Sequence, residues 1–372
     1  MHNVESVENI LTDQVQKVSR SFAFVIDQLP EPLRREVQVA YLLFRLGDNI
    51  EDTASLSPDE KSHLLSALLQ AFAAGQPFSA ELQARQSDLW TDLTEGEHEL
   101  MRLCDPIITA FSELDPSAKA SLLEQADIMF KGMAEIQRDH RKDGFVTLPD
   151  QGALDRYCYY VAGTVGDFLT DRFLTTMPNL PVHRRAQMLG AGRALALVLQ
   201  VTNILRDIRD DHEHGHIFYP RALFSDFSAP DLLNENRRIQ VLEAGRKMAT
   251  WLLPSVRLAS AFILGIPRHQ AALRLFAIIP YAMAIQTLTM SVLNPALFEP
   301  RPVKMTRSQT KQTVAIAKMA CRSDLGLRLW FEHLIHELER KIESPASING
   351  RPDAPRSGVI HRPTLQPDPH HD

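Results

Sequence analysis

Apolar residues recur every three or four positions along most of the chain, a spacing that aligns them on one face of a helix. This pattern predicts helices over residues 4–18, 31–52, 58–73, 84–113, 116–140, 151–176, 182–212, 230–264, 267–293, 307–319 and 324–343. Pro32 and Pro58 fit helix starts, where a missing backbone N–H costs little. The sequence shows no series of alternating strand patterns, no repeat and no glycine-rich phosphate loop. We therefore predict an all-α fold with a single domain across residues 1–343.

The longest apolar run, residues 273–290, is interrupted by Arg274, Pro280 and Gln286. It falls short of the roughly 18 uninterrupted apolar residues of a membrane span, so we predict a buried helix kinked at the proline. The acidic start of the chain lacks the apolar centre of a secretory signal. Residues 344–372 are rich in Pro, Ser, Asp and His, and are predicted to form a disordered polar tail.

Composition narrows the class of protein. Of the 372 residues, 44% are hydrophobic and 23% are charged, which is ordinary for a globular protein. The formal net charge of -6 gives no support to nucleic-acid binding. The three cysteines are widely separated and form no CxxC motif, which favours a reducing compartment. We expect a cytoplasmic protein, either soluble or peripheral to a membrane.

Two acidic motifs lie far apart in the chain, each at helical spacing. Asp48 and Asp52 are four residues apart, with Glu51 between them, and Asp207 and Asp211 repeat that spacing. Residues four apart share one face of a helix. Both motifs interrupt strongly apolar segments, where an unpaired buried charge is costly. The carboxylates therefore need partners, although each motif taken alone would also fit a solvated helix face.

Candidate partners stand beside both motifs. Arg45 lies one turn before the first motif, and Asn203 and Arg206 lead into the second. Mg²⁺ prefers oxygen ligands and commonly shares substrate phosphates with one or two carboxylates, and arginine binds phosphate oxygens through paired N–H groups. Two such clusters suit two substrate diphosphates bridged by Mg²⁺ or Mn²⁺. The arrangement points to ionisation of a prenyl diphosphate.

Several motifs together resemble the squalene/phytoene synthase family over most of residues 17–315. They are Ser19-Arg20-Ser21-Phe22, the DNIED segment with Arg45, YCYYVAG at 157–163, NILRD at 203–207 and FYP at 218–220. Residues 275–284 and 302–309 are most similar to the squalene synthase branch of that family. The resemblance implies an isoprenoid-synthase-type helical bundle around a central cavity.

The resemblance also implies a reaction. Two farnesyl diphosphates would condense head to head to presqualene diphosphate, which NADPH would then reduce to squalene. Implied metal ligands are Asp48, Glu51, Asp52, Asp207 and Asp211. Implied substrate-binding residues are Arg20, Ser21, Gln200, Asn203 and Arg206. Implied catalytic residues are Tyr157, Arg45, Phe22 and Phe276, and NADPH would bind Lys304 and Arg307.

The sequence departs from the family pattern in two places. Thr306 and Ser308 stand where the squalene synthase branch tends to carry a basic residue and a glycine, which weakens the NADPH assignment. The C-terminal membrane anchor of many eukaryotic members is missing, which implies a soluble or peripheral enzyme whose water-insoluble product favours membrane contact. Two alternatives stay open: a non-reductive synthase making presqualene diphosphate, dehydrosqualene or phytoene, and a non-catalytic lipid carrier.

Each assignment has a structural alternative. The arginines could pair with the carboxylates without touching substrate, and Tyr157 could be a hydrogen-bonded core residue. Phe22 and Phe276 are also ordinary core candidates. Gly163 and Gly166 fit close helix approach better than phosphate binding.

Overall fold

The computed structural model describes residues 7–19, 22–83, 90, 93–300 and 303–345. The expectations for Arg20, Ser21 and the tail from residue 346 onward fall outside these residues. The α-helices are α1 (Val7–Val18), α2 (Phe22–Ile26), α3 (Leu33–Asp52), α4 (Pro58–Ala74), α5 (Ser79–Gln83), α6 (Glu95–Arg102), α7 (Cys104–Ser112), α8 (Pro116–Asp139), α9 (Gln151–Cys158), α10 (Thr164–Thr175), α11 (Val182–Arg206), α12 (Ile208–Glu213), α13 (Arg238–Gly265), α14 (Ala271–Ser291), α15 (Arg307–Ala320) and α16 (Asp324–Glu343). The predicted all-α fold is confirmed.

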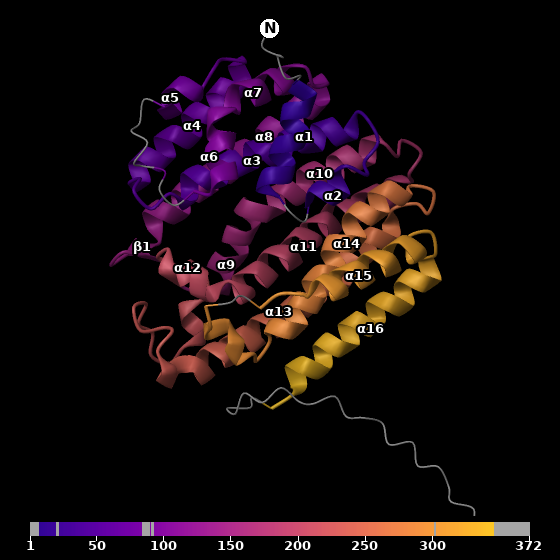
Figure 1. Ribbon diagram of the computed structural model, residues 1–372. Helices are drawn as coiled ribbons and strands as arrows, with labels where there is room; N and C mark the ends of the chain where they lie inside the picture. Colours follow the sequence, from indigo (N-terminus) through magenta and orange to yellow (C-terminus); the bar gives the residue numbers. More distant parts are fainter. Residues whose placement is uncertain (1–6, 20–21, 84–89, 91–92, 301–302, 346–372) are drawn as a thin grey trace, which may run out of the picture.

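The long helix α11 lies at the centre of the molecule. It packs against α10, α13 and α14, and Figure 1 shows it between the N-terminal helices, in indigo and magenta, and the C-terminal helices, in orange and yellow. On the N-terminal side, α3 packs against α4, α7 and α8. The first acidic motif forms the last turn of α3, and the second begins directly after the central helix α11 and continues into α12.

Three of the predicted helices are interrupted. The helix predicted over 84–113 contains α6 and α7, which are separated at Leu103. The helix predicted over 182–212 breaks at Asp207, between α11 and α12. A π-helical turn, Tyr159–Gly163, joins α9 to α10 within the helix predicted over 151–176. Such turns insert one extra residue and often mark functional sites.

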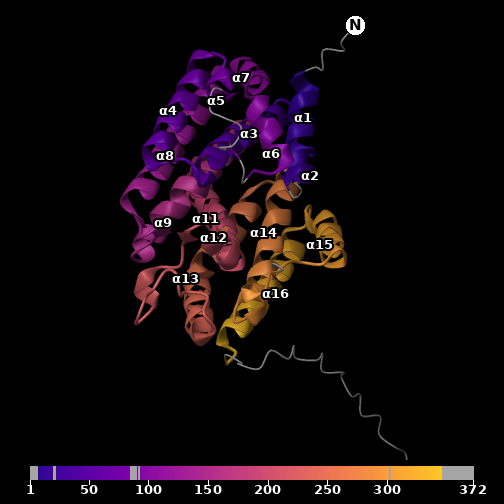
Figure 2. The same ribbon diagram turned by 60° about the vertical axis from the view of Figure 1, so that its left-hand side comes forward.

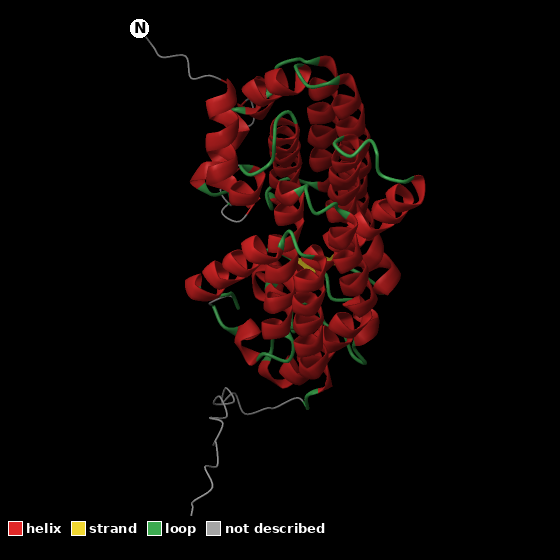
Figure 3. Ribbon diagram, turned by 90° about the vertical axis from the view of Figure 1, so that its right-hand side faces the viewer, coloured by secondary structure: helices red, strands yellow, loops and turns green. Residues whose placement is uncertain are grey.

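A small sheet was not predicted. Strand β1 (Arg141–Lys142) pairs antiparallel with β2 (Phe145–Thr147), which pairs parallel with β3 (His216–Ile217). These strands are too short for alternating polarity to register in sequence. They lie near the middle of the molecule (Figure 3), where β3 sets the position of His216 beside the acidic motifs.

Three helices of the described chain are long and apolar enough to cross a membrane, judged by length and composition alone. They are Val182–Arg206, Glu235–Gly265 and Ala271–Ser291. This criterion of length and composition allows isolated polar residues. It therefore accepts helices that the requirement for an uninterrupted apolar run would exclude. In α14, 67% of the apolar window is buried inside the protein, in line with the buried helix predicted for residues 273–290.

The crossing of α10 and α11 depends on glycine. A Cβ on Gly166 would lie 2.8 Å from the backbone oxygen of Gly192 and 3.0 Å from the Cβ of Ala196. Because the first obstacle is backbone, the two helices could not keep their present separation. The expectation that Gly166 allows close helix approach is confirmed.

Gly166→Ala is therefore expected to destabilise the protein by about 1–3 kcal/mol, the usual range for overpacking. Urea unfolding followed by circular dichroism measures the change. Gly190→Ala in α11 is the matched control, because nothing lies within 4 Å of its added Cβ and alanine favours helix. Equal stability of wild type and Gly166→Ala would contradict the proposed close crossing.

Candidate active site

Both acidic motifs line one polar pocket of about 270 Å³. Its walls comprise Arg45, Asp48, Glu51, Asp52, Met133, Tyr157, Val161, Gln200, Asn203, Ile204, Asp207, Asp211, His216 and Phe218. Nine of these residues were predicted from sequence to bind metal or substrate or to act in catalysis. The two motifs are thus brought together although about 150 residues separate them in the chain.

The first motif is crowded with negative charge. Burial is the largest influence on Asp48 and raises its pKa to about 7; Arg45 opposes this effect and Asp52 adds to it. Burial, followed by the charge of Glu51, likewise raises the pKa of Asp52 to about 7. The Asp52 side chain nevertheless keeps contact with solvent, because it opens onto the pocket. A bound cation would relieve this crowding.

Negative charge also accumulates around Asp211 in the second motif. The pKa of Asp211 lies well above its ordinary value, first through burial and then through the charges of Asp207 and Asp52. The influence of Asp52 couples the two motifs directly. Although α11 ends at Arg206, the Asp211 N–H still bonds the Asp207 carbonyl at 2.8 Å, so helical spacing survives the break.

As a set of donor atoms, these carboxylates suit a magnesium ion. All the acidic atoms are hard oxygen ligands, which Mg²⁺ and Mn²⁺ prefer. Among the residues that the structure describes, no three Asp, Glu, His or Cys side chains are grouped closely enough to hold a metal ion alone. Water or substrate oxygens must therefore complete the coordination shell, as is usual for Mg²⁺ bound together with phosphates.

Both predicted arginines pair with carboxylates. Arg45 contacts Glu97 and lies 3.8 Å from Asp48. Arg206 donates from Nε to Asp207 Oδ1 at 2.6 Å, and its second nitrogen reaches the other oxygen. Arg206 does not line the polar pocket itself but faces a neighbouring one, where Asn203 is also present. Both arginines therefore form carboxylate ion pairs, which the sequence had left open as an alternative to substrate binding.

A buried polar network supports the first motif, and sequence reasoning missed its members. Gln137 donates to the Glu51 carboxylate and lies 3.2 Å from His216 Nε2. Lys61, which is almost fully buried, donates to the Glu51 carbonyl at the end of α3. The amide of Gln137 thus holds Glu51, whereas Asp48 and Asp52 remain available to the pocket. The signal that could have identified Lys61 and Gln137 is that each is a polar side chain on an otherwise apolar helix face.

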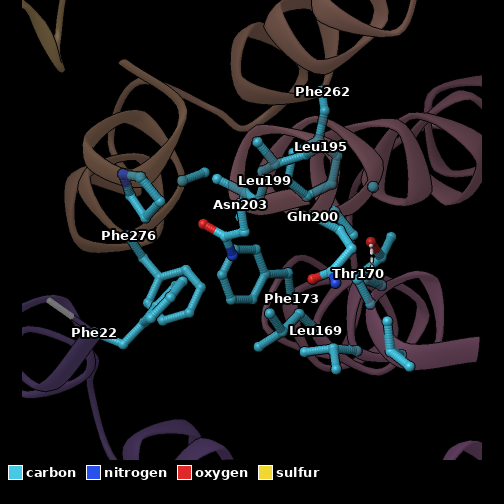
Figure 4. A pocket seen from close by; sticks show the side chains of 18 residues that line it. Phe22, Leu169, Thr170, Phe173, Leu195, Leu199, Gln200, Asn203, Phe262 and Phe276 are labelled. Atoms are coloured by element: carbon cyan, nitrogen blue, oxygen red, sulfur yellow. Dashed lines mark hydrogen bonds between the residues drawn. The ribbon is translucent and has the colours of Figure 1, made fainter. Parts of the chain in front are cut away.

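Two apolar pockets adjoin the polar one. The first, of about 200 Å³, is drawn in Figure 4 and lies among α10, α11 and α14; the second, of about 160 Å³, lies among α3, α8 and α10. Both include Phe22, Phe276 and Val161, and Val161 also lines the polar pocket. Figure 4 shows Phe22 and Phe276 reaching the first pocket from different helices.

Apart from Val161, each apolar pocket shares different residues with the polar one. The first shares Gln200 and Asn203 with it, on the helix that leads to the second acidic motif. The second shares Arg45 and Asp48 of the first motif. The site therefore has one polar head region and two apolar arms, each reaching the head region beside its own acidic motif.

Tyr157 lies in the polar head region. It is buried and stacks on Phe218 with ring centroids 4.2 Å apart. Burial, followed by the charges of Glu51 and Asp52, raises the pKa of the Tyr157 phenol well above its ordinary value. The phenol therefore keeps its proton at neutral pH.

The predicted NADPH residues lie apart from the pockets. Lys304 and Arg307 are exposed on either side of the start of α15, and neither lines the polar pocket, the two arms or the third pocket beside Arg206. The described geometry brings together the predicted condensation site but not the predicted nucleotide site.

A helical bundle with aspartate pairs at the head of apolar chambers defines the class of isoprenoid synthases. The family model for squalene/phytoene synthase matches residues 15–309. The chain belongs to the squalene/phytoene synthase family.

Individual relatives agree with this assignment. A probable squalene synthase from Neurospora crassa is 29% identical over 306 residues, which cover 80% of this chain and 59% of the relative. A squalene synthase from Solanum lycopersicum is 30% identical over 315 residues, covering 81% and 68%. A solved complex of TcSQS with the ligand E5700 has a TM-score of 0.72 at 25% identity, covering 91% of this chain and 98% of that one. The chain thus spans about three fifths of the Neurospora protein.

Proposed function

We propose that this protein joins two farnesyl diphosphates head to head, giving presqualene diphosphate, and then reduces that product to squalene with NADPH. The family and the names of its relatives support the squalene synthase assignment. One geometric observation carries the condensation step: two apolar arms reach a single polar pocket, each beside its own acidic motif.

Two long prenyl chains and two diphosphates match this arrangement in number and polarity. One chain would occupy the arm among α3, α8 and α10, with its diphosphate at Asp48 and Asp52. The other would occupy the arm among α10, α11 and α14, with its diphosphate at Asp207 and Asp211. Mg²⁺ held by these aspartates supplies Lewis-acid neutralisation of the leaving diphosphate.

The chain's own cations and amides line the head region or, in the case of Arg206, the pocket beside it. Arg45 and Arg206 are already oriented by carboxylates, and each retains N–H donors for phosphate oxygens. Gln200 and Asn203 lie where the first arm meets the polar pocket and would orient the second substrate there. The proposed roles of Arg20 and Ser21 concern residues outside the described part of the chain.

Ionisation of one substrate leaves an allylic cation, which the double bond of the other attacks. The faces of Phe22 and Phe276 would stabilise this cation by about 0.5–2 kcal/mol each. The apolar walls of both arms exclude water that would quench it. Closing the cyclopropane releases a proton, and the departing diphosphate is the better acceptor, because a protonated Tyr157 donates a hydrogen bond rather than accepting that proton.

The reductive step rests on resemblance alone. Lys304 and Arg307 line none of the four pockets described above, so these pockets give no support to a nucleotide held by the two residues beside the prenyl chains. A non-reductive head-to-head synthase is therefore the second candidate function. It requires only the polar pocket and its two arms.

Product analysis separates the candidates. Purified protein is incubated with farnesyl diphosphate and Mg²⁺, with and without NADPH, and in parallel with geranylgeranyl diphosphate. Squalene that forms only with NADPH supports the full proposal, and an unchanged product without NADPH supports the non-reductive synthase. If tight substrate binding occurs with no product under any condition, the protein is a lipid carrier and the catalytic proposal fails.

We further propose a helical domain over residues 1–343, followed by a polar tail, in a protein that works in the cytoplasm or at a membrane surface. The tail from residue 346 lies outside the described residues. A squalene product, being insoluble in water, would favour release at a membrane.

A further inference from the structure

Exposed apolar side chains gather where α15 turns into α16. Met319, Leu325 and Leu329 are 76%, 68% and 65% exposed, and Leu325 and Leu329 stand one turn apart on α16. Phe24 on α2 is also exposed and lies beneath Lys318, whose Nζ is 5.3 Å from the ring centroid. In Figures 1 and 2, α2 and α15 lie on the same flank of the molecule.

Basic residues surround these apolar side chains. We use the name α15–α16 tip for Lys318, Met319, Arg322, Leu325, Arg328 and Leu329, all of which are exposed. Helix α15 contains no acidic residue. The one carboxylate between residues 318 and 329, Asp324, is paired with Arg274 at 2.7 Å and with Arg268 at 3.7 Å. The tip is therefore positive in a chain whose net charge is -6.

This combination favours an anionic lipid surface over other partners. Long aliphatic side chains ringed by lysine and arginine are typical of helices that lie in the membrane interface. The basic side chains can extend along the apolar surface while their charged ends meet lipid phosphates. An anionic membrane would repel the rest of this protein, whose net charge is negative, and attract the tip. The charge distribution therefore also sets the orientation in which the protein docks.

The position of the tip relative to the site points the same way. Phe22, two residues before Phe24 on α2, lines both apolar arms and the third pocket. Helix α14 packs against both α2 and α15. Helix α2 therefore meets the tip at Phe24 and the apolar arms at Phe22, so a hydrocarbon product would leave close to lipid; this last point rests on the proposed function.

We propose that α2 and the α15–α16 tip dock the protein on anionic lipid membranes. Docking itself requires no turnover, so it can be tested separately from the catalytic proposal. The probe is flotation of the full chain with vesicles of phosphatidylcholine alone and of phosphatidylcholine with phosphatidylglycerol. Binding to the mixed vesicles is expected to exceed binding to neutral ones at least tenfold, and to fall with added salt.

Each of the two matched variants replaces two exposed leucines with glutamate. Leu325→Glu with Leu329→Glu is expected to lower the fraction bound to anionic vesicles at least tenfold, with unchanged circular dichroism. Leu189→Glu with Leu258→Glu, on α11 and α13, adds the same charge at exposed leucines elsewhere and is expected to retain at least half of the binding. Lys318→Glu is a second test that leaves the leucines intact and should also reduce binding.

Three outcomes would overturn the proposal. The wild-type chain could fail to bind anionic vesicles, or the tip and control variants could lose binding equally. Size-exclusion chromatography could instead show a dimer that only the tip variant dissociates, without vesicle binding, in which case a second copy of the chain covers the tip.

Discussion

Asp48→Asn and Asp211→Asn are each expected to lower turnover of farnesyl diphosphate with Mg²⁺ by about a hundredfold or more, comparable to the loss of one preorganised charge-stabilising group. Asparagine keeps the size of the side chain and one oxygen but removes the negative charge. Both aspartates line the polar pocket, one from each acidic motif. Steady-state rates over a Mg²⁺ titration measure the effect, and the Mg²⁺ concentration for half-maximal rate should also rise.

The control for this experiment is one residue away. Asp210 is exposed on α12 beside Asp211 and does not line the polar pocket. Asp210→Asn therefore removes the same charge from the same helix and should change the rate less than threefold. Wild-type turnover in Asp48→Asn or Asp211→Asn, or an equal loss in Asp210→Asn, would contradict the metal assignment.

Ala162→Phe is expected to reduce kcat/KM for farnesyl diphosphate by at least about tenfold, because even one methylene of misfit in an apolar pocket changes this ratio by about 10- to 200-fold. Ala162 is partly exposed and lines the arm among α10, α11 and α14, where a phenyl ring would take the space proposed for a prenyl chain. The loss should be smaller with the shorter geranyl diphosphate. This substrate ratio does not depend on the fraction of folded enzyme.

A second variant tests the other arm. Ala40 lines the arm among α3, α8 and α10, and Ala40→Phe should produce a similar shift toward the shorter substrate. Ala186→Phe, at an exposed position of α11, is the control and should leave the ratio unchanged. If filling either arm leaves the ratio at its wild-type value, the prenyl chains lie elsewhere.

The polar head region was predictable because its chemistry is local in sequence. Aspartates four apart inside apolar segments can be read directly, and the high cost of leaving them unpaired predicts cationic partners such as Arg45 or a bound metal ion. The break at Asp207 was not predictable, because the apolar pattern continues through Ile208. The helix ends there although the spacing of the aspartates is retained.

Features that depend on tertiary packing escaped the sequence. Val165 and Leu169 of α10 line both arms, and although Gly166 indicated a close helix approach, no residue pattern identified α3 and α11 as the partners of α10. Lys61 and Gln137 contact Glu51 from α4 and α8, helices distant from α3 in sequence. The nucleotide assignment of Lys304 and Arg307 came from resemblance, and the described pockets give it no support.

The position of the metal ions tests the central claim most directly. Crystals grown with Mn²⁺ and the poorly reactive analogue farnesyl thiodiphosphate would locate the ions by anomalous scattering. We expect Mn²⁺ between analogue phosphates and both aspartate pairs, Asp48 with Asp52 and Asp207 with Asp211, and one farnesyl chain in each apolar arm. Manganese bound away from both pairs, or analogue chains outside the two arms, would contradict the account.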